Sequence, residues 1–360
     1  MRASLRIFRV LGIDVEVHIS LLILLLLLIY AFTVTPSPFG FANFPFLERI
    51  ILSAASAIAL FASILLHELS HSIFARRYGV KVKKIMLFIF GGVAMMESLP
   101  RKPKEEFTVA IAGPAASIGI AALSFLLSFV PHGALSAFFT LFAYFNFILA
   151  LFNLIPAFPM DGGRILRSFL AERMGYAKAT RLAAEVGRGL AIFMAIFGIF
   201  YNPWLILIAL FIYIGASEEE RLVLLENVLG GVKVEDVMSR DVLFLTPDTK
   251  VSEVMELLLK YKHLGYPVVD GDRLVGIVTL KDIIGANPDD TVENVMSEEV
   301  VTIEPQKSAF EAFKIMSEKG IGRLPVVENG KVVGIISRSD LMRVKEILEA
   351  LEVMGWRRSS

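Results

Sequence analysis

Long apolar runs in the first 217 residues constrain this chain more than any other feature. They recur near 18–35, 50–74, 107–130, 135–155, 186–201 and 203–217. A helix of roughly 20 apolar residues crosses the hydrocarbon core of a bilayer. The hydrophobic share of the whole chain, 55%, also exceeds that of soluble proteins. We therefore expect a multi-pass α-helical membrane protein with about six transmembrane helices in contact with the lipid bilayer.

Lysine and arginine are unevenly distributed between these runs. The N-terminus, the segment near 75–105 and the segment after 155 are basic, whereas the loop at 35–47 and the Asn202-Pro203 turn carry no basic residue. Cytoplasmic loops carry the excess of positive charge. We expect the N-terminus, both basic loops and the C-terminus to be cytoplasmic in a cell-membrane protein. The net charge is zero and no basic tract stands out, so we expect no nucleic-acid partner.

Three ionisable residues interrupt the second apolar run, in the stretch LLHELSH. His67 and His71 are one helical turn apart on the same face, so both imidazoles can reach one ion. Glu68 lies about 100° round the helix and can act as a general base toward a water molecule at the ion. The chain has no cysteine, so a further ligand must be His, Asp or Glu. Asp161 of NLIPAFPMDGGR is the candidate, and this ligand set fits zinc, with iron or cobalt as alternatives.

Each of these residues also has a structural interpretation. The cluster around His67 could hold helices together by hydrogen bonds, and Asp161 before two glycines could be a turn residue. We prefer a functional site, because ionisable groups at membrane depth are costly and mark function by default. Gly113-Pro114 predicts close helix packing and no chemistry.

HELSH and NLIPAFPMDGGR together resemble the site-2 protease family of intramembrane zinc metalloproteases, over residues 1–217. The resemblance implies a zinc metalloendopeptidase that cleaves a transmembrane segment of a membrane-tethered protein, as in regulated intramembrane proteolysis. It implies zinc ligands and a general base at the positions named above: His67, His71 and Asp161 as ligands, Glu68 as the base.

The resemblance also implies a catalytic role for Asn153, whose amide could stabilise the oxyanion or position the substrate. An interhelical hydrogen bond is the alternative. The β-prone segment 83–97 resembles the strand on which the family docks its substrate. Strand addition would satisfy the backbone of an unwound helix, and Gly91 and Gly92 would allow close approach. A plain surface hairpin is the alternative interpretation of this segment.

The chain repeats itself beyond the apolar region. VEDVMS at 234–239 recurs as VENVMS at 292–297, and Gly276 recurs as Gly334, 58 residues later, without a gap. β-branched runs alternate with helical patterns in both repeats, which predicts soluble α+β units. The expected boundaries are 1–217 for the membrane domain, 218–231 for a linker with a hinge at Gly230-Gly231, and 232–288 and 289–348 for the repeats.

The repeat resembles a tandem pair of cystathionine-β-synthase (CBS) domains. The resemblance implies a regulatory adenine nucleotide (ATP, ADP or AMP), with Asp282 and Asp340 at the ribose hydroxyls and Thr279 and Ser337 nearby. Taken singly, Thr279 and Ser337 are also good helix N-caps, with the aspartates in the first turn. The resemblance further allows a homodimer formed through the CBS pair.

A rival function remains open, because CBS pairs also regulate ion channels and transporters. The intramembrane cluster of His, Glu and Asp would then be a transported-ion site. The lack of inverted hydropathy repeats disfavours a transporter, and the intact ligand set disfavours an inactive scaffold.

Overall fold

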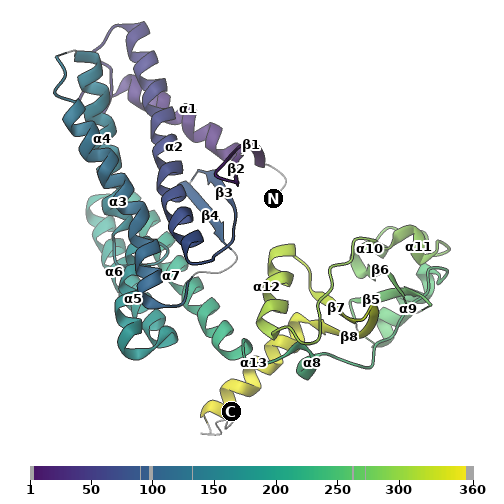
Figure 1. Cartoon of the computed structure of the whole chain (residues 1–360). Coiled ribbons are helices and arrows are strands. Elements are labelled where there is room, and N and C mark those ends of the chain that lie inside the picture. Colours follow the sequence, from purple (N-terminus) through teal and green to yellow (C-terminus); the bar gives the residue numbers. More distant parts are fainter. Residues whose placement is uncertain are drawn as a thin grey trace. The chain divides into compact units, whose positions relative to one another are not determined.

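The computed structural model describes residues 4–89, 91–96, 100–131, 133–261, 263–271 and 273–353. The chain divides into two compact units, Met1–Arg221 and Leu222–Ser360, and each is described by itself. Figure 1 follows the chain from the N-terminal unit to the C-terminal unit.

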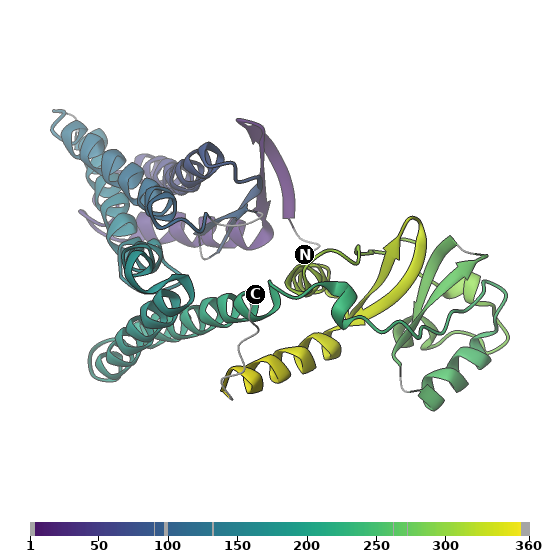
Figure 2. The ribbon, with the colours of Figure 1, turned by 60° about the horizontal axis from the view of Figure 1, so that its bottom comes forward.

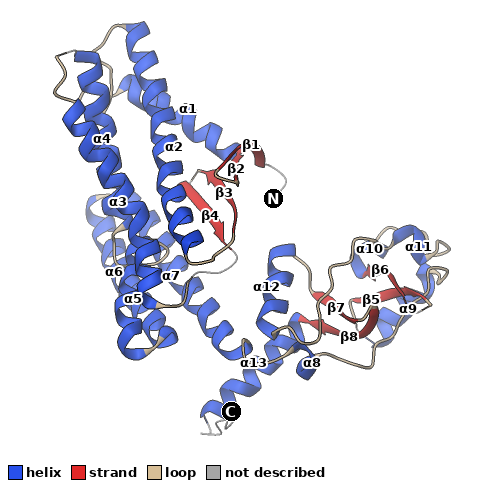
Figure 3. Ribbon diagram, viewed as in Figure 1, coloured by secondary structure: helices blue, strands red, loops and turns tan. Residues whose placement is uncertain are grey.

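Helices dominate the first unit (Figure 3). They are α1 Ile19–Val34, α2 Phe46–Arg77, α3 Pro103–Leu127, α4 Gly133–Asn153, α5 Asp161–Met174, α6 Tyr176–Tyr201 and the part of α7 Trp204–Leu229 that ends at Arg221. Among the described residues, α2, α3, α4 and α6 are long and apolar enough to cross a membrane. The expected class, a multi-pass α-helical membrane domain, is confirmed.

The expected number of about six spanning helices is not confirmed. α1 is apolar but has only 16 residues, which is about 24 Å of helix and less than the hydrocarbon core. α7 begins with an apolar half but continues through Glu218, Glu219 and Glu220, which interrupt the apolar stretch. Both regions are helical as expected, and each falls short of a full span by length or by charge.

Small residues bring α2 and α3 close together. The buried face of α3 includes Ala110, Gly113 and Ser117, and a Cβ on Gly113 would meet His67 and His71 of α2. Helices in membranes associate through such small residues, because they let the two backbones approach. This approach places the histidines of α2 directly against α3.

A four-stranded sheet covers part of α2. Its strands are β1 Ser4–Val10, β2 Ile13–His18, β3 Val82–Phe88 and β4 Gly91–Met96, in the order β1-β2-β3-β4. β2 and β3 are parallel, so α1 and α2 form the connection between them. Ile85 and Leu87 of β3 pack with Phe61 of α2, and Figure 1 shows β4 beside the C-terminal part of α2. β4 is thus an edge strand, and the β structure expected over 83–97 is confirmed within the described residues.

The second unit contains the two repeats (Figure 2). Its elements are α8 Val234–Val237, α9 Val251–Tyr261, β5 Gly265–Asp270, β6 Arg273–Thr279, α10 Leu280–Ile283, α11 Val292–Val295, α12 Ala309–Lys319, β7 Arg323–Glu328, β8 Lys331–Ser337 and α13 Arg338–Val353. The hairpins β5–β6 and β7–β8 have equivalent registers, with Gly265 opposite Thr279 in one and Arg323 opposite Ser337 in the other. The α+β class of the repeats is confirmed.

The two repeats exchange their leading segments. Ser239 of the first repeat bridges to Ile335 of the second, and Ser297 of the second bridges to Ile277 of the first. The hydrophobic cores follow this exchange, since Val234 is buried with the second repeat and Val292 with the first. Neither repeat therefore has a complete core without the other.

The segment expected as a linker, 218–231, is helical as far as Leu229. Leu225 and Leu229 are buried in the same core as Ile336 of the second repeat. Gly230 and Gly231 follow the helix directly and belong to the second compact unit. The predicted domain boundaries remain predictions.

Candidate metal centre

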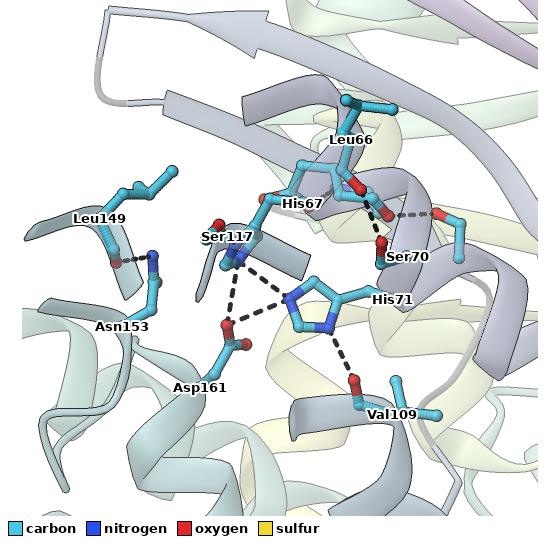
Figure 4. A network of polar contacts seen from close by, with 12 residues as sticks. Leu66, His67, Ser70, His71, Val109, Ser117, Leu149, Asn153 and Asp161 are labelled. Carbon is cyan, nitrogen blue, oxygen red and sulfur yellow. Dashed lines mark hydrogen bonds and ion pairs between the residues drawn. The ribbon is translucent and has the colours of Figure 1, made fainter. Parts of the chain in front are cut away.

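Three side chains from two distant parts of the chain converge at one point. His67 Nε2 and His71 Nε2 lie 3.2 Å apart, and they are 3.2 and 3.1 Å from Oδ2 of Asp161. Figure 4 shows the two rings and the carboxylate directed toward one another. The three residues are 3%, 5% and 7% exposed, so the cluster is nearly closed to solvent. Among the described residues they form the one group suited to hold a metal ion.

The geometry of this cluster fits zinc. Zinc binds imidazole nitrogen and carboxylate oxygen at about 2.0–2.2 Å in a tetrahedral arrangement, so its ligand atoms are about 3.3 Å apart. The three separations of 3.1–3.2 Å match that edge length. Three protein ligands with a fourth position left for water are typical of catalytic zinc sites, whereas structural sites use four.

Helix α3 orients both histidine rings. His71 Nδ1 donates to the carbonyl oxygen of Val109 at 2.7 Å. A carbonyl only accepts, so Nδ1 carries the proton and Nε2 of the neutral ring keeps its lone pair for a metal. His67 Nδ1 lies 2.9 Å from Oγ of Ser117, which can accept in the same way. Such contacts fix the tautomer and the ring orientation of metal-binding histidines.

Gly113 of α3 makes room for the two imidazoles. A Cβ atom at this position would lie 2.2 Å from His71 Nε2 and 2.6 Å from His67 Nε2. The close packing expected from Gly113-Pro114 is present, and its partner is the metal-binding face itself. Gly113 is thus part of the site, although it contributes no chemical group.

A tight turn places Asp161 at the start of α5. Residues 154–160 fold back onto the first turn of this helix, so a Cβ on Gly162 would lie 2.2 Å from the carbonyl oxygen of Ile155. A Cβ on Gly163 would lie 2.6 Å from the backbone nitrogen of Phe158.

A fully buried arginine anchors the same helix. Arg167 of α5 donates from Nε to Glu106 of α3 at 2.8 Å and from Nη1 to Glu219 of α7 at 2.7 Å. Its guanidinium lies 4.8 Å from the ring centre of Phe158 and 4.7 Å from that of Tyr176. Burial would lower the pKa of Arg167, but Glu106 and Glu219 raise it above its ordinary value. This charge network joins three helices one turn beyond the Asp161 turn.

Glu68 is half-buried on α2, beside the strand β4. The backbone N–H of Ala94 donates to Glu68 Oε2 at 3.1 Å. A Cβ on Gly92 would lie 2.5 Å from Glu68 Cγ, so the glycine is required where the glutamate passes the strand. Gly91 has a φ of +122°, a conformation that disfavours other residues. The predicted base and the predicted docking strand are thus in direct contact.

Asn153 is the last residue of α4. Its Nδ2 donates to the carbonyl oxygen of Leu149 at 2.9 Å, within its own helix (Figure 4). The sequence suggested an interhelical hydrogen bond as the alternative role of Asn153, but the side chain bonds within its own helix. The second N–H of the amide is left for another acceptor, and the catalytic role of Asn153 stays a prediction.

The four residues predicted to bind nucleotide form two equivalent capping boxes. The backbone N–H and the hydroxyl of Thr279 donate to Asp282 Oδ2 at 2.7 and 2.6 Å. Ser337 donates to Asp340 Oδ2 in the same way, at 2.9 and 2.6 Å. The capping interpretation from the sequence is confirmed, and each aspartate retains its Oδ1. The nucleotide role stays a prediction.

Three features of the site were not predicted from the sequence: the contacts of Val109 and Ser117 with the histidines, the position of Gly113 against the two rings, and the charge network. Val109 acts through its backbone, and Ser117 and Gly113 are small residues of a kind that recurs throughout apolar helices. Glu106 and Arg167 carry a signal that could have been used, since each is a charged residue next to an apolar run. That these two residues form an ion pair is seen only in the folded structure.

Fold and site together define the class: a membrane-domain zinc metalloprotease. The sequence matches Peptidase family M50 over 55–133 and 128–195, and the CBS domain over 234–289 and 292–347. A zinc metalloprotease of Methanocaldococcus jannaschii is 38% identical over 98% of this chain and 99% of its own length. A Mycobacterium tuberculosis protein named as zinc metalloprotease, Rip3, is 32% identical over 85% of this chain and 84% of its own. A solved site-2 protease of M. jannaschii is 41% identical, covering 60% of this chain and 95% of its own, with a TM-score of 0.43.

The chain therefore belongs to the site-2 protease family, Peptidase family M50, and it is a zinc metalloprotease with a tandem CBS pair. The resemblance seen in HELSH and NLIPAFPMDGGR is confirmed.

Proposed function

We propose that this chain is an intramembrane zinc metalloendopeptidase that cuts a transmembrane segment of a membrane-tethered protein near its cytoplasmic side. This is the reaction of regulated intramembrane proteolysis. The observation that carries the proposal is the convergence of His67 Nε2, His71 Nε2 and Asp161 Oδ2 within 3.2 Å of one another, inside a helical membrane domain. Charged groups at that depth are otherwise costly.

The residues divide the chemistry among them. His67, His71 and Asp161 would hold a zinc ion, which would supply polarisation of the scissile carbonyl and a water with its pKa lowered to about 7. Glu68 takes a proton from the attacking water and delivers it to the amine as the C–N bond breaks. The free N–H of Asn153 donates to the oxygen that gains negative charge.

In this proposal, the strand β4 forms hydrogen bonds with the backbone of the substrate. A transmembrane helix satisfies its own N–H and C=O groups, and unwinding it in lipid leaves them unpaired. β4 is one of the two outer strands of its sheet, and the free edge of such a strand can pair with an extended segment. Gly91 and Gly92 begin this strand and let another backbone approach closely.

Mass spectrometry of the products tests this function. Wild-type protein in detergent should cut a single-span test substrate, and the new termini should lie within the apolar segment. Glu68→Gln keeps the size of the side chain without its basicity and should leave the substrate intact. Cleavage confined to the soluble flanks, or cleavage by Glu68→Gln, would contradict the proposal.

We propose further that the N-terminus, the active-site end and the CBS pair face the cytoplasm, as the basic loops predict. The absence of cysteine makes this testable, because a single cysteine can be introduced anywhere. In intact cells, a membrane-impermeant maleimide should label Ser37→Cys and should spare Ser317→Cys until the membrane is opened. The reverse pattern would overturn this orientation.

We also propose that the CBS pair binds an adenine nucleotide (ATP, ADP or AMP) that modulates cleavage, and that it can mediate a homodimer. The free Oδ1 atoms of Asp282 and Asp340 suit a ribose diol. Arg323 of the second repeat donates to the carbonyl oxygen of Gly265 in the first at 2.8 Å, which places a positive charge where the repeats meet. Calorimetry should show binding that is lost in Asp282→Ala or Asp340→Ala and kept in Asp289→Ala, a change at an exposed carboxylate.

A further inference from the structure

The amide of Ala94 points away from its own sheet. Ala94 lies opposite Ile85 in the antiparallel pair β3–β4. Opposed residues in such a pair alternate between those that exchange hydrogen bonds and those that do not. The Ala94 N–H donates to Glu68 Oε2 at 3.1 Å, so its pair with Ile85 is of the second kind. The amide therefore belongs to the free edge of β4.

Glu68 reaches this edge because Gly92 has no side chain. The glutamate passes within the space that a Cβ of Gly92 would need, 2.5 Å from Cγ. Ile64, one turn earlier on α2, borders the same space at 3.2 Å. The carboxylate thus occupies the position from which an added strand would accept a hydrogen bond. A charged acceptor at such a position binds more strongly than a peptide carbonyl does.

We propose that Glu68 and an extended substrate segment compete for the Ala94 N–H. This inference rests on the proposed proteolytic function and adds a specificity device to it. Without substrate, the edge strand holds the carboxylate of the general base. A substrate segment that adds to β4 accepts from Ala94 through its own carbonyl oxygen and releases the carboxylate toward the water.

Competition of this kind selects the conformation of the substrate. The carbonyls of an intact helix are engaged in their own hydrogen bonds, so a helical segment cannot displace Glu68. An unwound segment has free carbonyls that need partners, and it can displace the carboxylate. Release of the base is thereby tied to unwinding, and a folded helix that drifts past the site leaves Glu68 bound to the strand.

Binding measurements on inactive variants test the competition directly. Glu68→Gln retains an oxygen that can accept from Ala94, whereas Glu68→Ala does not. Both lack the base, so a labelled single-span peptide stays uncut during the measurement. We expect Glu68→Ala to bind the peptide about threefold to tenfold more tightly than Glu68→Gln, as fits the loss of one competing hydrogen bond.

Two further variants complete the cycle. Ala94→Pro removes the N–H from a position that a free edge tolerates, and in that background Glu68→Ala and Glu68→Gln should bind the peptide equally. Glu172→Ala removes an exposed carboxylate elsewhere, and in the Glu68→Gln background it should leave affinity unchanged. Equal affinities of Glu68→Ala and Glu68→Gln with Ala94 present would overturn the inference. Cleavage by wild-type protein would still support the proposed function in that case.

Hydrogen exchange gives a second measurement that needs neither peptide nor proline. The Ala94 amide should exchange slowly in wild type and in Glu68→Gln, despite its place at a free edge. It should exchange faster in Glu68→Ala, at least tenfold by the loss of a hydrogen bond worth about 1.4 kcal/mol. Equal exchange in Glu68→Ala and wild type would refute the contact on which the competition depends.

Discussion

Ser117 Oγ on α3 lies 2.9 Å from His67 Nδ1 on α2 and is fully buried. The residue sits two helical turns beyond Val109, whose carbonyl accepts from His71. One helix thus fixes both histidine rings, and its contacts are made on the side of each ring away from the ligand atom. The orientation of the two histidine ligands is consequently set by the α2–α3 pair, and α2 alone does not define it.

Replacement of this hydroxyl should weaken metal binding. Ser117→Ala leaves His67 free to rotate or change tautomer, and we expect zinc affinity to fall about 10- to 100-fold, as for other contacts behind a metal ligand. Competition with a chromogenic chelator measures this. Ser124→Ala on the same helix is the control, because the Ser124 hydroxyl donates to the carbonyl oxygen of Ile120 within α3. This variant should bind zinc like wild type. An equal loss of zinc affinity in both variants would contradict the role of Ser117.

A single methyl group at Gly113 should abolish the site. In Gly113→Ala the new Cβ would lie 2.2 Å from His71 Nε2, closer than atoms approach, so the ligands must separate. We expect no zinc retained after dialysis and no cleavage. Gly119→Ala is the matched control, since its Cβ would meet nothing within 4 Å. Zinc retention by Gly113→Ala would show that the ligand cluster is elsewhere.

The buried arginine should be essential for stability. Arg167→Met strands the carboxylate of Glu106, which is 1% exposed, and breaking a buried ion pair costs about 3–5 kcal/mol. Arg167→Lys should not rescue it, because a lysine cannot contact Glu106 and Glu219 in the same forked geometry. Unfolding in detergent measures the loss. Arg181→Met removes an exposed pair and should change stability by less than about 1 kcal/mol.

An ion pair between Glu16 of β2 and Lys84 of β3 makes the stability of the sheet depend on pH. A hydrogen bond from Lys84 at 2.7 Å lowers the pKa of Glu16 below its ordinary value of 4.5. A carboxyl with a lowered pKa stabilises the fold fully above its ordinary pKa, and this stabilisation is lost as the pH falls through the lowered value. Exchange protection of β3 should therefore decline below about pH 4.5, by up to about 1 kcal/mol.

Lys84→Met removes the partner of Glu16. The variant should be less protected at neutral pH and should lose the pH dependence that Glu16 gives to β3. A wild-type strand whose protection is the same at pH 3 and pH 6 would show that the pair contributes nothing.

Much of this arrangement could be predicted, for identifiable reasons. His67, Glu68 and His71 lie within about one helical turn, so their spacing alone predicts that the two imidazoles can reach the same ion. Asp161 is 90 residues from His71, and only the motif around it and its depth in the membrane connected the two. The β structure of β3 and β4 was predictable from the β-branched and aromatic residues around Gly91-Gly92.

Other features depend on contacts that a linear pattern does not encode. Gly113 and Ser117 look like any small residues of an apolar helix, and their importance comes from what lies opposite them. Ala94 acts through a backbone amide, which every residue possesses. Val234 is buried in the core of the second repeat and Val292 in that of the first. The sequence does not reveal this exchange, because the two repeats have similar residues at these positions.

The most direct test of the central claim measures zinc and cleavage in the same preparations. Wild type and Glu68→Gln should each hold one zinc ion per chain, Asp161→Asn should hold none or bind it far more weakly, and only wild type should cut the single-span substrate. That pattern would establish a metal site built from α2 and α5 with Glu68 as its base. Full zinc occupancy in Asp161→Asn, or cleavage by Glu68→Gln, would contradict the account.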